Sequence, residues 1–128
     1  MKQVLFIEPD AIVAALYGDI LTRHGYNVIY TKSAQQAIAA ADKHLPDVVV
    51  TELQIARHNG VEFLYEFKSY TEWQNIPVVV LSSLPARTLA KYTSLTDQLR
   101  VVAVLRKSET TAALLLKTVD DIVQTEQR

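Results

Sequence analysis

The chain has 128 residues, of which 49% are hydrophobic, with 13 basic and 14 acidic side chains and no cysteine. This length predicts one globular domain, and the even charge balance argues against a surface that binds nucleic acid. The lack of cysteine excludes disulfide bonds and thiolate metal sites, and no apolar run reaches the roughly 18 residues that a membrane span needs. Because the polar start before Val4 is too short for a signal peptide, we expect a cytoplasmic protein.

An apolar run at residues 4–7 predicts the first strand. The run is continuous rather than alternating, which is typical of a strand that is covered on both faces. A helix should follow, with Asp10 as its N-cap, His24 near its end and Gly25 as the residue that stops it. The apolar residues expected on its inner face are Ile12, Leu16 and Ile20, with Val13 and Tyr17 beside them.

A second strand is predicted at residues 27–30, followed by a second helix. Ser33 and Gln36 have the spacing of a capping box, which marks the start of this helix. The helix should run to about His44, because Pro46 prevents its continuation. The residues expected on its inner face are Ala34, Ile38, Ala41 and Leu45.

The third and fourth strands are predicted at residues 48–51 and 77–81, with a polar loop and a helix between them. The loop covers residues 53–59, where we expect His58 to be solvated. The helix should run from 61 to 69, and its buried side chains should be Phe63, Leu64 and Phe67. Trp73 precedes the fourth strand, and we expect it to cover apolar surface locally rather than to bind a partner.

The last third of the chain predicts a weak helix, a strand at residues 101–105 and a long helix. Pro85 suits the first turn of the weak helix, whose modest apolar face contains Leu89, Tyr92 and Leu95. Ser108 is the expected cap of the long helix, which should reach about Gln124. Its inner face should carry Leu115, Val119 and Ile122. We assign residues 1–124 to the domain and 125–128 to a C-terminal tail.

Five strands that alternate with five helices predict an α/β protein with one parallel sheet and helices on both faces. Among the doubly wound arrangements we expect the flavodoxin-like strand order 2-1-3-4-5. The carboxyl ends of parallel strands meet at one edge of a sheet, which is where such folds place their sites. The polar residues that follow the strands at this edge are Glu8, Asp10, Glu52, Ser82 and Lys107.

Taken together, these residues resemble the receiver domain of two-component response regulators over about residues 4–123. The family's third strand and the loop after it are similar to residues 46–52 together with Asn59 and Gly60. Its fourth strand is similar to residues 76–83, and its lysine corresponds to Lys107. The resemblance implies an aspartate at the end of the third strand that accepts a phosphoryl group from a histidine kinase. It also implies an acidic pair after the first strand that holds magnesium.

Several positions depart from this pattern. Glu52 stands at the position of the phosphoacceptor aspartate, and its carboxylate lies one methylene further from the backbone. Because the rate of phosphoryl transfer is sensitive to a displacement of the reacting group by about 1 Å, this change matters for function. Pro9 replaces the second acid of the pair, which removes a magnesium ligand. Val104 stands at the family's aromatic switch position, and Ala56 and Ser108 replace prolines. The peptide bond before the second proline is often cis in the family, and without proline a cis bond is disfavoured.

Three interpretations of Glu52 follow from these departures. Glu52 can form an ordinary ion pair with Lys107, it can mimic the phosphorylated state by reaching Ser82 and Lys107, or it can still accept a phosphoryl group. The sequence is equally compatible with two roles for Ser82, which are contact with a phosphoryl oxygen and capping of the next helical turn.

The function we infer is that of an atypical receiver, sometimes called a pseudo-receiver, which is not an enzyme and signals by protein contact without a cofactor. The alternative is a competent receiver that binds magnesium and accepts a phosphoryl group at Glu52. A small flavin-type cofactor-binding protein is a remote alternative, because the loop at residues 8–10 is acidic, lacks glycine and would repel a phosphate.

The resemblance implies protein partners, such as a histidine kinase or an effector domain. It also implies a homodimer through the fourth helix, fifth strand and fifth helix.

Overall fold

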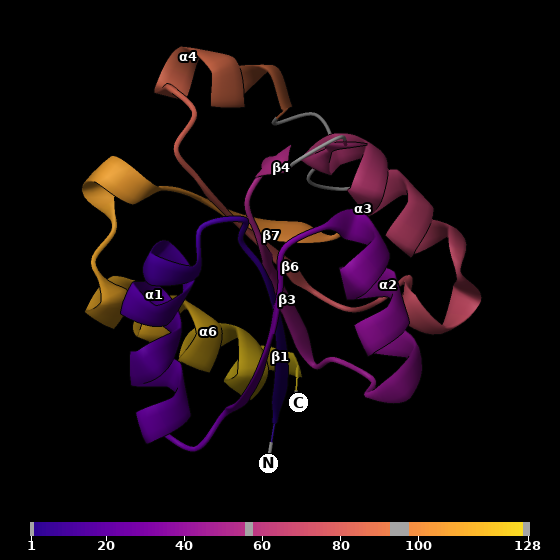
Figure 1. Ribbon diagram of the computed structural model, residues 1–128, viewed down its shortest axis with the longest axis horizontal. Helices are drawn as coiled ribbons and strands as arrows, with labels where there is room; N and C mark the ends of the chain where they lie inside the picture. The colour runs from indigo at the N-terminus through magenta and orange to yellow at the C-terminus, as the bar shows by residue number, and fades with distance from the viewer. Residues whose placement is uncertain (1, 56–57, 93–97, 127–128) are drawn as a thin grey trace.

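The computed structural model describes residues 2–55, 58–92 and 98–126 and contains a five-stranded sheet between helices (Figure 1). The strands of this sheet are β1 (Gln3–Ile7), β2 (Asn27–Thr31), β3 (Val48–Thr51), β6 (Val78–Ser82) and β7 (Val101–Arg106). The α-helices are α1 (Ala11–Arg23), α2 (Ala34–Lys43), α3 (Gly60–Ser69), α4 (Ala86–Leu89) and α6 (Ala112–Glu126). Shorter elements are the strands β4 (Gln54–Ile55) and β5 (His58–Asn59) and the 3-10 turns η1 (Thr71–Trp73), η2 (Ala90–Tyr92) and η3 (Lys107–Glu109). None of the helices in these ranges is long and apolar enough to cross a membrane.

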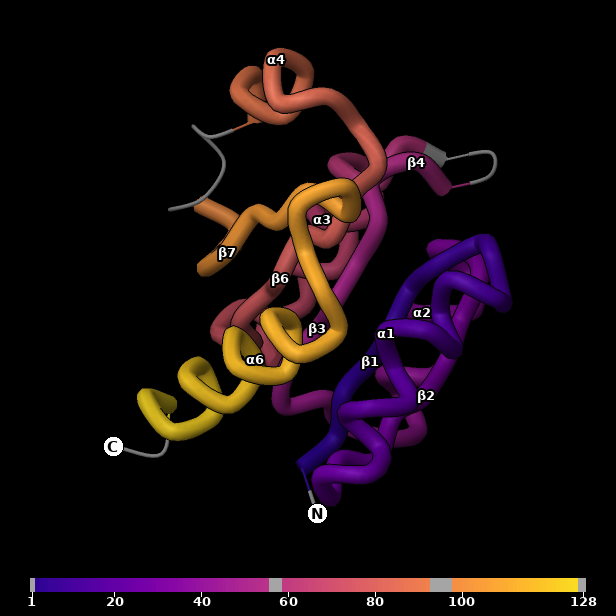
Figure 2. The backbone as a smooth tube through the Cα atoms, turned by 90° about the vertical axis from the view of Figure 1, so that its left-hand side faces the viewer, coloured from indigo at the N-terminus to yellow at the C-terminus, as the bar shows by residue number. Residues whose placement is uncertain are grey.

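The strands of the main sheet are all parallel to their neighbours, in the order β2-β1-β3-β6-β7. Counted within this sheet, the order is the predicted flavodoxin-like 2-1-3-4-5. The separate antiparallel pair β4–β5, which lies in the predicted polar loop, was not expected. Helices α1 and α6 lie on one face of the sheet and α2 and α3 on the other, while α4 lies beyond the carboxyl ends of the strands (Figures 1 and 2).

The core forms one layer on each side of the sheet. The layer beneath α2 and α3 is built around the rings of Phe63, Phe67 and Trp73, and the layer beneath α1 and α6 around Phe6 and Leu115. All four residues of β3 are buried, as its continuous apolar run predicts. The inner faces predicted for the helices at 61–69 and in the C-terminal segment are confirmed by the burial of Phe63, Leu64, Phe67, Leu115 and Val119 and by the packing of Ile122.

Trp73 is a core residue rather than a local cover. Its ring is buried and stacks on Phe67, with 4.8 Å between the ring centroids. The ammonium group of Lys68 is also buried and donates hydrogen bonds to the carbonyl oxygens of Trp73 (3.1 Å), Gln74 (3.3 Å) and Ile76. Burial lowers the pKa of Lys68 to about 8, and the positive charge of Arg100 acts in the same direction. These bonds hold the segment between α3 and β6 in place.

The predicted signals at helix ends are present, with one difference. Asp10 accepts hydrogen bonds from the first turn of α1 at 2.9 and 3.2 Å, and Gly25 follows α1 with a φ of +92°. Ser33 accepts from the N–H of Gln36 at 3.2 Å, as a capping box requires. The return bond, however, joins the Gln36 side chain to the N–H of Lys32 at 2.8 Å rather than to that of Ser33.

The inner face predicted for α1 is wrong at Ile12 and Leu16, whereas Tyr17 is buried and Val13 and Ile20 pack partly buried against the core. Ile12 and Leu16 are 82% and 65% exposed, and the buried residues of this helix are Ala14, Tyr17, Gly18 and Leu21. Gly18 lies on the packed side of α1, where Tyr30 of β2 lies across it. A Cβ atom at Gly18 would be only 2.1 Å from the Tyr30 hydroxyl oxygen. Apolar residues occur around the whole helix, so their spacing alone does not identify the packed side.

The prediction that Leu45 faces inward is also wrong, because Leu45 is 61% exposed. Helix α2 ends at Lys43 and His44 is extended, so the helical spacing no longer applies at Leu45. Ala37 is buried instead, together with the predicted Ala34 and Ala41, and Ile38 packs partly buried against the same layer.

The start and end of the last helix also differ from the prediction. Ser108 does not cap α6, because it lies in η3; the hydroxyl of Thr111 accepts from the N–H of Leu114 at 3.1 Å instead. The helix continues to Glu126, so two residues assigned to the tail are helical. The peptide bond between Lys107 and Ser108 is trans, as are the other peptide bonds of the described residues.

The weak helix before the last strand is a single turn, α4, that continues into η2. Pro85 precedes its first turn in an extended conformation. Leu89 is buried, and Tyr92 packs partly buried against the layer beneath α2 and α3. Leu95, which was expected on the same apolar face, and Ala56 lie outside the described residues.

We predict that Gly60→Ala destabilises the protein. A Cβ atom at Gly60 would lie 2.6 Å from the Leu53 Cα and 2.9 Å from the Glu52 carbonyl oxygen, and backbone cannot move aside cheaply. The free energy of unfolding in urea should fall by about 2–4 kcal/mol. Gly18→Ala is the control, because its added methyl group meets only the end of the Tyr30 side chain. Equal losses for the two variants would contradict the prediction.

Candidate functional site

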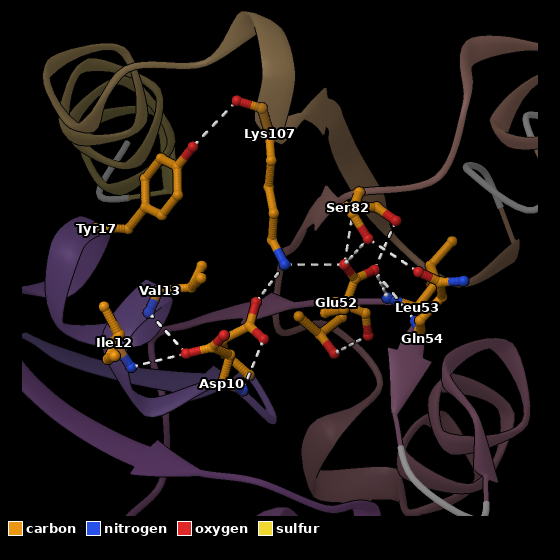
Figure 3. A network of polar contacts seen from close by, with 12 residues as sticks. Asp10, Ile12, Val13, Tyr17, Glu52, Leu53, Gln54, Ser82 and Lys107 are labelled. Carbon is orange, nitrogen blue, oxygen red and sulfur yellow. Dashed lines mark hydrogen bonds and ion pairs between the residues drawn. The ribbon is translucent and has the colours of Figure 1, made fainter.

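The side chains of Glu8, Glu52, Ser82 and Lys107 meet at the carboxyl edge of the main sheet, and Figure 3 shows the last three of them. Glu8 follows β1, Glu52 follows β3, Ser82 ends β6 and Lys107 follows β7. Glu8, Glu52 and Ser82 are buried, with 4%, 2% and 0% of their surface exposed. The parallel arrangement therefore collects two carboxylates, a hydroxyl and an ammonium group in one small volume.

The Oε2 atom of Glu52 accepts hydrogen bonds from the chain that surrounds it. Its donors are the backbone N–H groups of Leu53 (2.6 Å) and Gln54 (3.1 Å) and the hydroxyl of Ser82 (2.5 Å). The Ser82 oxygen in turn accepts from the N–H of Leu84 at 3.1 Å. The carboxylate thus joins the loop after β3 to the loop after β6.

The Oε1 atom of Glu52 is equally occupied. It accepts from the backbone N–H of Ser83 at 2.8 Å and from the ammonium group of Lys107 at 2.9 Å. The Ser83 hydroxyl also lies 3.0 Å from it. A carboxylate has about four lone-pair positions, so these donors leave none of them free.

Lys107 bridges the two buried carboxylates. Its Nζ atom contacts Oε1 of Glu8 as well as Oε1 of Glu52. The other oxygen of Glu8 accepts from the backbone N–H of Asp10 at 3.0 Å. Two carboxylates share one ammonium group, so the cluster carries one net negative charge when all three side chains are ionised.

Hydrogen bonding keeps Glu52 and Lys107 ionised. Burial alone raises the pKa of Glu52, but the bonds from Ser82, Lys107, Ser83 and Gln54 outweigh it and lower the pKa to about 2. Burial likewise lowers the pKa of Lys107, and the hydrogen bonds and charges of Glu8 and Glu52 reverse this and raise it above its ordinary value. At neutral pH, Glu52 is a carboxylate and Lys107 an ammonium ion.

Asp10 lies beside the cluster without joining it. Its Oδ1 atom caps α1 by accepting from the N–H groups of Ile12 and Val13, and the residue is exposed (Figure 3). Pro9 separates it from Glu8. Of the two acids in the predicted pocket, the structure therefore brings only the side chain of Glu8 to Lys107.

Two residues of the network, Ser83 and Gln54, were not singled out from the sequence. The Ser83 hydroxyl lies 2.9 Å from the side-chain oxygen of Gln54 as well as 3.0 Å from Glu52. A hydroxyl has one hydrogen, so it donates to one of these oxygens at a time. The adjacent serines Ser82 and Ser83 at the end of the strand could have indicated the role of Ser83, since both a hydroxyl group and a backbone N–H can donate to a nearby carboxylate there.

Tyr17 positions the lysine from the other side. Its hydroxyl contacts two carbonyl oxygens, that of Lys107 at 3.1 Å (Figure 3) and that of Thr110 at 2.8 Å. A hydroxyl hydrogen can serve only one of them at a time, but both contacts hold the turn η3 against α1. Tyr17 thus fixes the backbone from which the Lys107 side chain extends.

The remaining predicted positions, Val104 and His58, are not among the residues that form the cluster. Val104 is 37% exposed on β7 and has no polar role. His58 lies in β5, opposite Ile55.

The donors present do not fit magnesium, which the resemblance implies for this site. Magnesium requires near-octahedral oxygen ligands and usually binds through one or two carboxylates. Here the oxygens of Glu52 and Glu8 already face N–H, hydroxyl or ammonium groups. Over residues 2–55, 58–92 and 98–126, no group of three or more histidine and acidic side chains is placed to hold a metal ion.

Curated proteins with similar sequences are response regulators. The polar-differentiation response regulator DivK of Brucella ovis is 28% identical over 82 residues, which cover 64% of this chain and 67% of that protein. The protein of the same name from Brucella anthropi is 27% identical over the same shares.

Solved structures share the fold. A sensor protein from Polaromonas sp. JS666 has a TM-score of 0.86 at 19% identity, covering 97% of both chains. The chemotaxis response regulator CheY4 of Vibrio cholerae has a TM-score of 0.82 at 20% identity, covering 95% of this chain and 98% of that chain. The sequence profile of the response regulator receiver domain matches residues 4–120. Since this match covers most of its length, the chain belongs to the response regulator receiver domain family.

Proposed function

We propose that this receiver domain is atypical and signals through protein contacts without accepting a phosphoryl group on Glu52. The observation that carries the proposal is the occupancy of the Glu52 carboxylate. Each of its oxygens accepts at least two hydrogen bonds of 3.1 Å or less from groups fixed by the fold. A phosphoacceptor needs a free lone pair aligned with the incoming phosphorus, and this arrangement leaves none.

The same contacts support a state that does not switch by phosphorylation. Ser82 and Lys107 stand at the two positions that contact the phosphoryl group in the family. In this chain both bind the carboxylate of Glu52, whose extra methylene gives it the necessary reach. We infer that Glu52 acts as a built-in anion that holds these two groups permanently.

The proposed domain works without magnesium or another cofactor and has no enzymatic activity. Pro9 removes one acid of the family pair, and Lys107 supplies the positive charge that the remaining carboxylates need. The fit of the lysine between Glu8 and Glu52 supports this reading. A competent receiver that uses Glu52 is the alternative, which the following experiments address.

The partners we propose are proteins, such as a histidine kinase, an effector domain or a second copy of the chain. The surface formed by α4, β7 and α6 supports a protein contact, because Val102, Val104 and Leu114 expose apolar side chains there. A groove of about 420 Å³ opens on this surface between Leu89 and Leu114. Clustered exposed apolar residues commonly mark interaction sites.

We expect no stable adduct of the domain with acetyl phosphate or beryllofluoride. The occupied oxygens of Glu52 cannot attack phosphorus, and they cannot bind beryllium. Intact-mass measurement after incubation with acetyl phosphate and magnesium should show the unmodified mass. A mass increase of one phosphoryl group that maps to Glu52 would overturn the proposed function and favour the competent receiver.

The double substitution Pro9→Asp with Glu52→Asp should create a magnesium site. It restores the second acid and retracts the other carboxylate by one methylene, which frees oxygens for an octahedral ion. Magnesium titration followed by NMR shifts near residue 8 should saturate in the millimolar range for the double variant and show no local saturation for the parent. Glu52→Asp alone, which lacks the second acid, is the matched control. A double variant that ignores magnesium would mean that the pocket is not a degraded receiver site.

The stabilising effect of Glu52 should depend on pH. Its pKa is about 2 in the folded protein against an ordinary 4.5, so the stabilisation is complete above pH 4.5 and is lost as the pH falls toward 2. This difference corresponds to on the order of 3 kcal/mol. At pH 7, Glu52→Gln should therefore lower the free energy of unfolding by about 2–4 kcal/mol. The gap between variant and parent should nearly close by about pH 2.

Urea denaturation at a series of pH values measures this gap. The control is Asp19→Asn, which removes only an exposed ion pair with Arg23 and should change the free energy of unfolding by less than about 1 kcal/mol. A gap for Glu52→Gln that does not change with pH would show that Glu52 is not held as a carboxylate.

A further inference from the structure

Strand β2 forms one edge of the main sheet, on the opposite side of the molecule from β7 (Figure 2). Proteins usually protect such an edge with charged side chains, proline or a bulge, because its unpaired backbone groups can bind another strand. The β7 edge has such protection, since β7 ends with Arg106 and its pairing with β6 is irregular between Val78 and Val79. Strand β2 contains no charged residue and no proline, and its pairing with β1 is regular. Its outer edge is therefore suited to pair with another strand.

The residues of β2 whose backbone groups face this outer edge are Val28 and Tyr30. In a parallel pair, alternate residues direct their N–H and C=O groups toward the neighbouring strand. The N–H of Asn27 donates to the residue just before β1 at 2.9 Å, and the carbonyl oxygen of Thr31 accepts from the residue just after β1 at 2.9 Å. Asn27, Ile29 and Thr31 therefore face β1. The backbone groups of Val28 and Tyr30 face away from it.

Two copies of β2 can satisfy these outward groups in an antiparallel pair. A two-fold axis through Ile29 places Val28 of each copy opposite Tyr30 of the other. Each of these two pairs exchanges both of its backbone hydrogen bonds, so four bonds satisfy every outward group at positions 28 and 30. Val28 and Tyr30 both lie on the α1 face of the sheet. The pairing thus joins an aromatic to a β-branched side chain across the strands, a combination that stabilises antiparallel sheets.

Helix α1 exposes an apolar stripe beside this edge. Ile12 and Leu16 are largely exposed, and together with Ala15 and Tyr30 they line an open groove of about 870 Å³. In a sheet that continues through β2 into a second copy, the two α1 helices lie antiparallel on the same face. Neighbouring helices pack with their axes about 8–10 Å apart, so the two stripes can cover each other. Removing Ile12 and Leu16 from water would stabilise this contact.

The charges at the ends of α1 favour the same arrangement. The helix begins after the exposed Asp10 and has Arg23 in its last turn. In an antiparallel pair, the acidic start of each helix lies toward the basic end of the other, and the dipoles of the two helices oppose each other. The contact therefore places unlike charges, rather than like ones, at both of its ends.

We propose that the chain forms a two-fold symmetric dimer in which β2 pairs with β2 of a second copy and α1 packs against α1. The contact uses the same surface of both copies, so it closes and leaves neither β2 edge free. The surface of α4, β7 and α6 lies at the two far ends of the joined sheet, and the dimer presents it twice. The inference goes beyond the proposed function, because it does not depend on whether Glu52 accepts a phosphoryl group.

Sedimentation equilibrium of the purified chain should show twice the monomer mass of 14.4 kDa, with a dissociation constant of about 10 μM or below. Leu16→Lys places a charge in the helix contact and should raise this constant at least about tenfold. Leu114→Lys is the matched control, because it changes another exposed leucine on the surface of α4, β7 and α6 and should leave the constant unchanged. Ile12→Lys is a second variant of the α1 stripe with the same expected effect as Leu16→Lys.

Amide hydrogen exchange tests the strand pairing itself. In the dimer, the N–H groups of Val28 and Tyr30 should exchange at least about tenfold more slowly than in the Leu16→Lys monomer, because only the dimer gives them acceptors. The N–H of Ile29 faces β1 and should be protected equally in both, so it serves as the internal control.

A chain that stays monomeric at about 100 μM would overturn the proposal. A dimer that Leu114→Lys weakens as much as Leu16→Lys, or more, would place the contact at α4, β7 and α6 and would also overturn it. The same holds for a dimer in which Val28 and Tyr30 exchange as fast as in the monomer. An adduct on Glu52 together with the expected dimer would remove the proposed function and leave this contact standing.

Discussion

A buried carboxylate that cannot be left unpaired determines how the carboxyl edge of this domain is arranged. Placing Glu52 away from water would be costly without Lys107 and the surrounding N–H groups. Its hydrogen bonds draw the loops after β3 and β6 together, and Lys107 brings in the loop after β7. Tyr17 then fixes that last loop against α1. Three loops at this edge therefore meet around one buried charge.

The features that could be predicted from the sequence are those with a strong local or periodic signal. The continuous apolar run of β3 indicates a strand covered on both faces, and the spacing of Phe63, Leu64 and Phe67 identifies the inner face of α3. The alternation of strands and helices then indicates a parallel, doubly wound sheet, and the expected order 2-1-3-4-5 is one of the orders that such sheets adopt. Because parallel strands end at one edge, the approach of Glu52 to Lys107 could also be expected.

What could not be predicted depends on contacts between distant segments. The packed side of α1 includes Gly18, across which Tyr30 of a distant strand lies, and the spacing of Ile12 and Leu16 cannot reveal that contact. The cap of α6 moved from Ser108 to Thr111 because a 3-10 turn intervenes. Gln54 enters the site through the backbone path of the loop after β3, for which the sequence contains no signal, whereas the adjacent serines were the only hint of Ser83. The fold that this chain shares with other receivers accounts for its architecture, whereas the chemistry of the site depends on these local contacts.

The full occupancy of Glu52 has a consequence for how such a sequence can change over generations. A return to aspartate shortens the side chain and leaves the donors of Ser82, Ser83 and Lys107 with a poorer acceptor, which reduces stability before any reactivity is regained. If Pro9 changes to aspartate first, a further carboxylate joins Glu8 and Glu52 around a single lysine. Whichever of Glu52 and Pro9 changes first, the single variant is less stable than the parent. The effect of a substitution at one of these positions therefore depends on the residue at the other. Under the proposed function, the occupied pocket is therefore expected to persist, because each single substitution toward a phosphoacceptor lowers stability first.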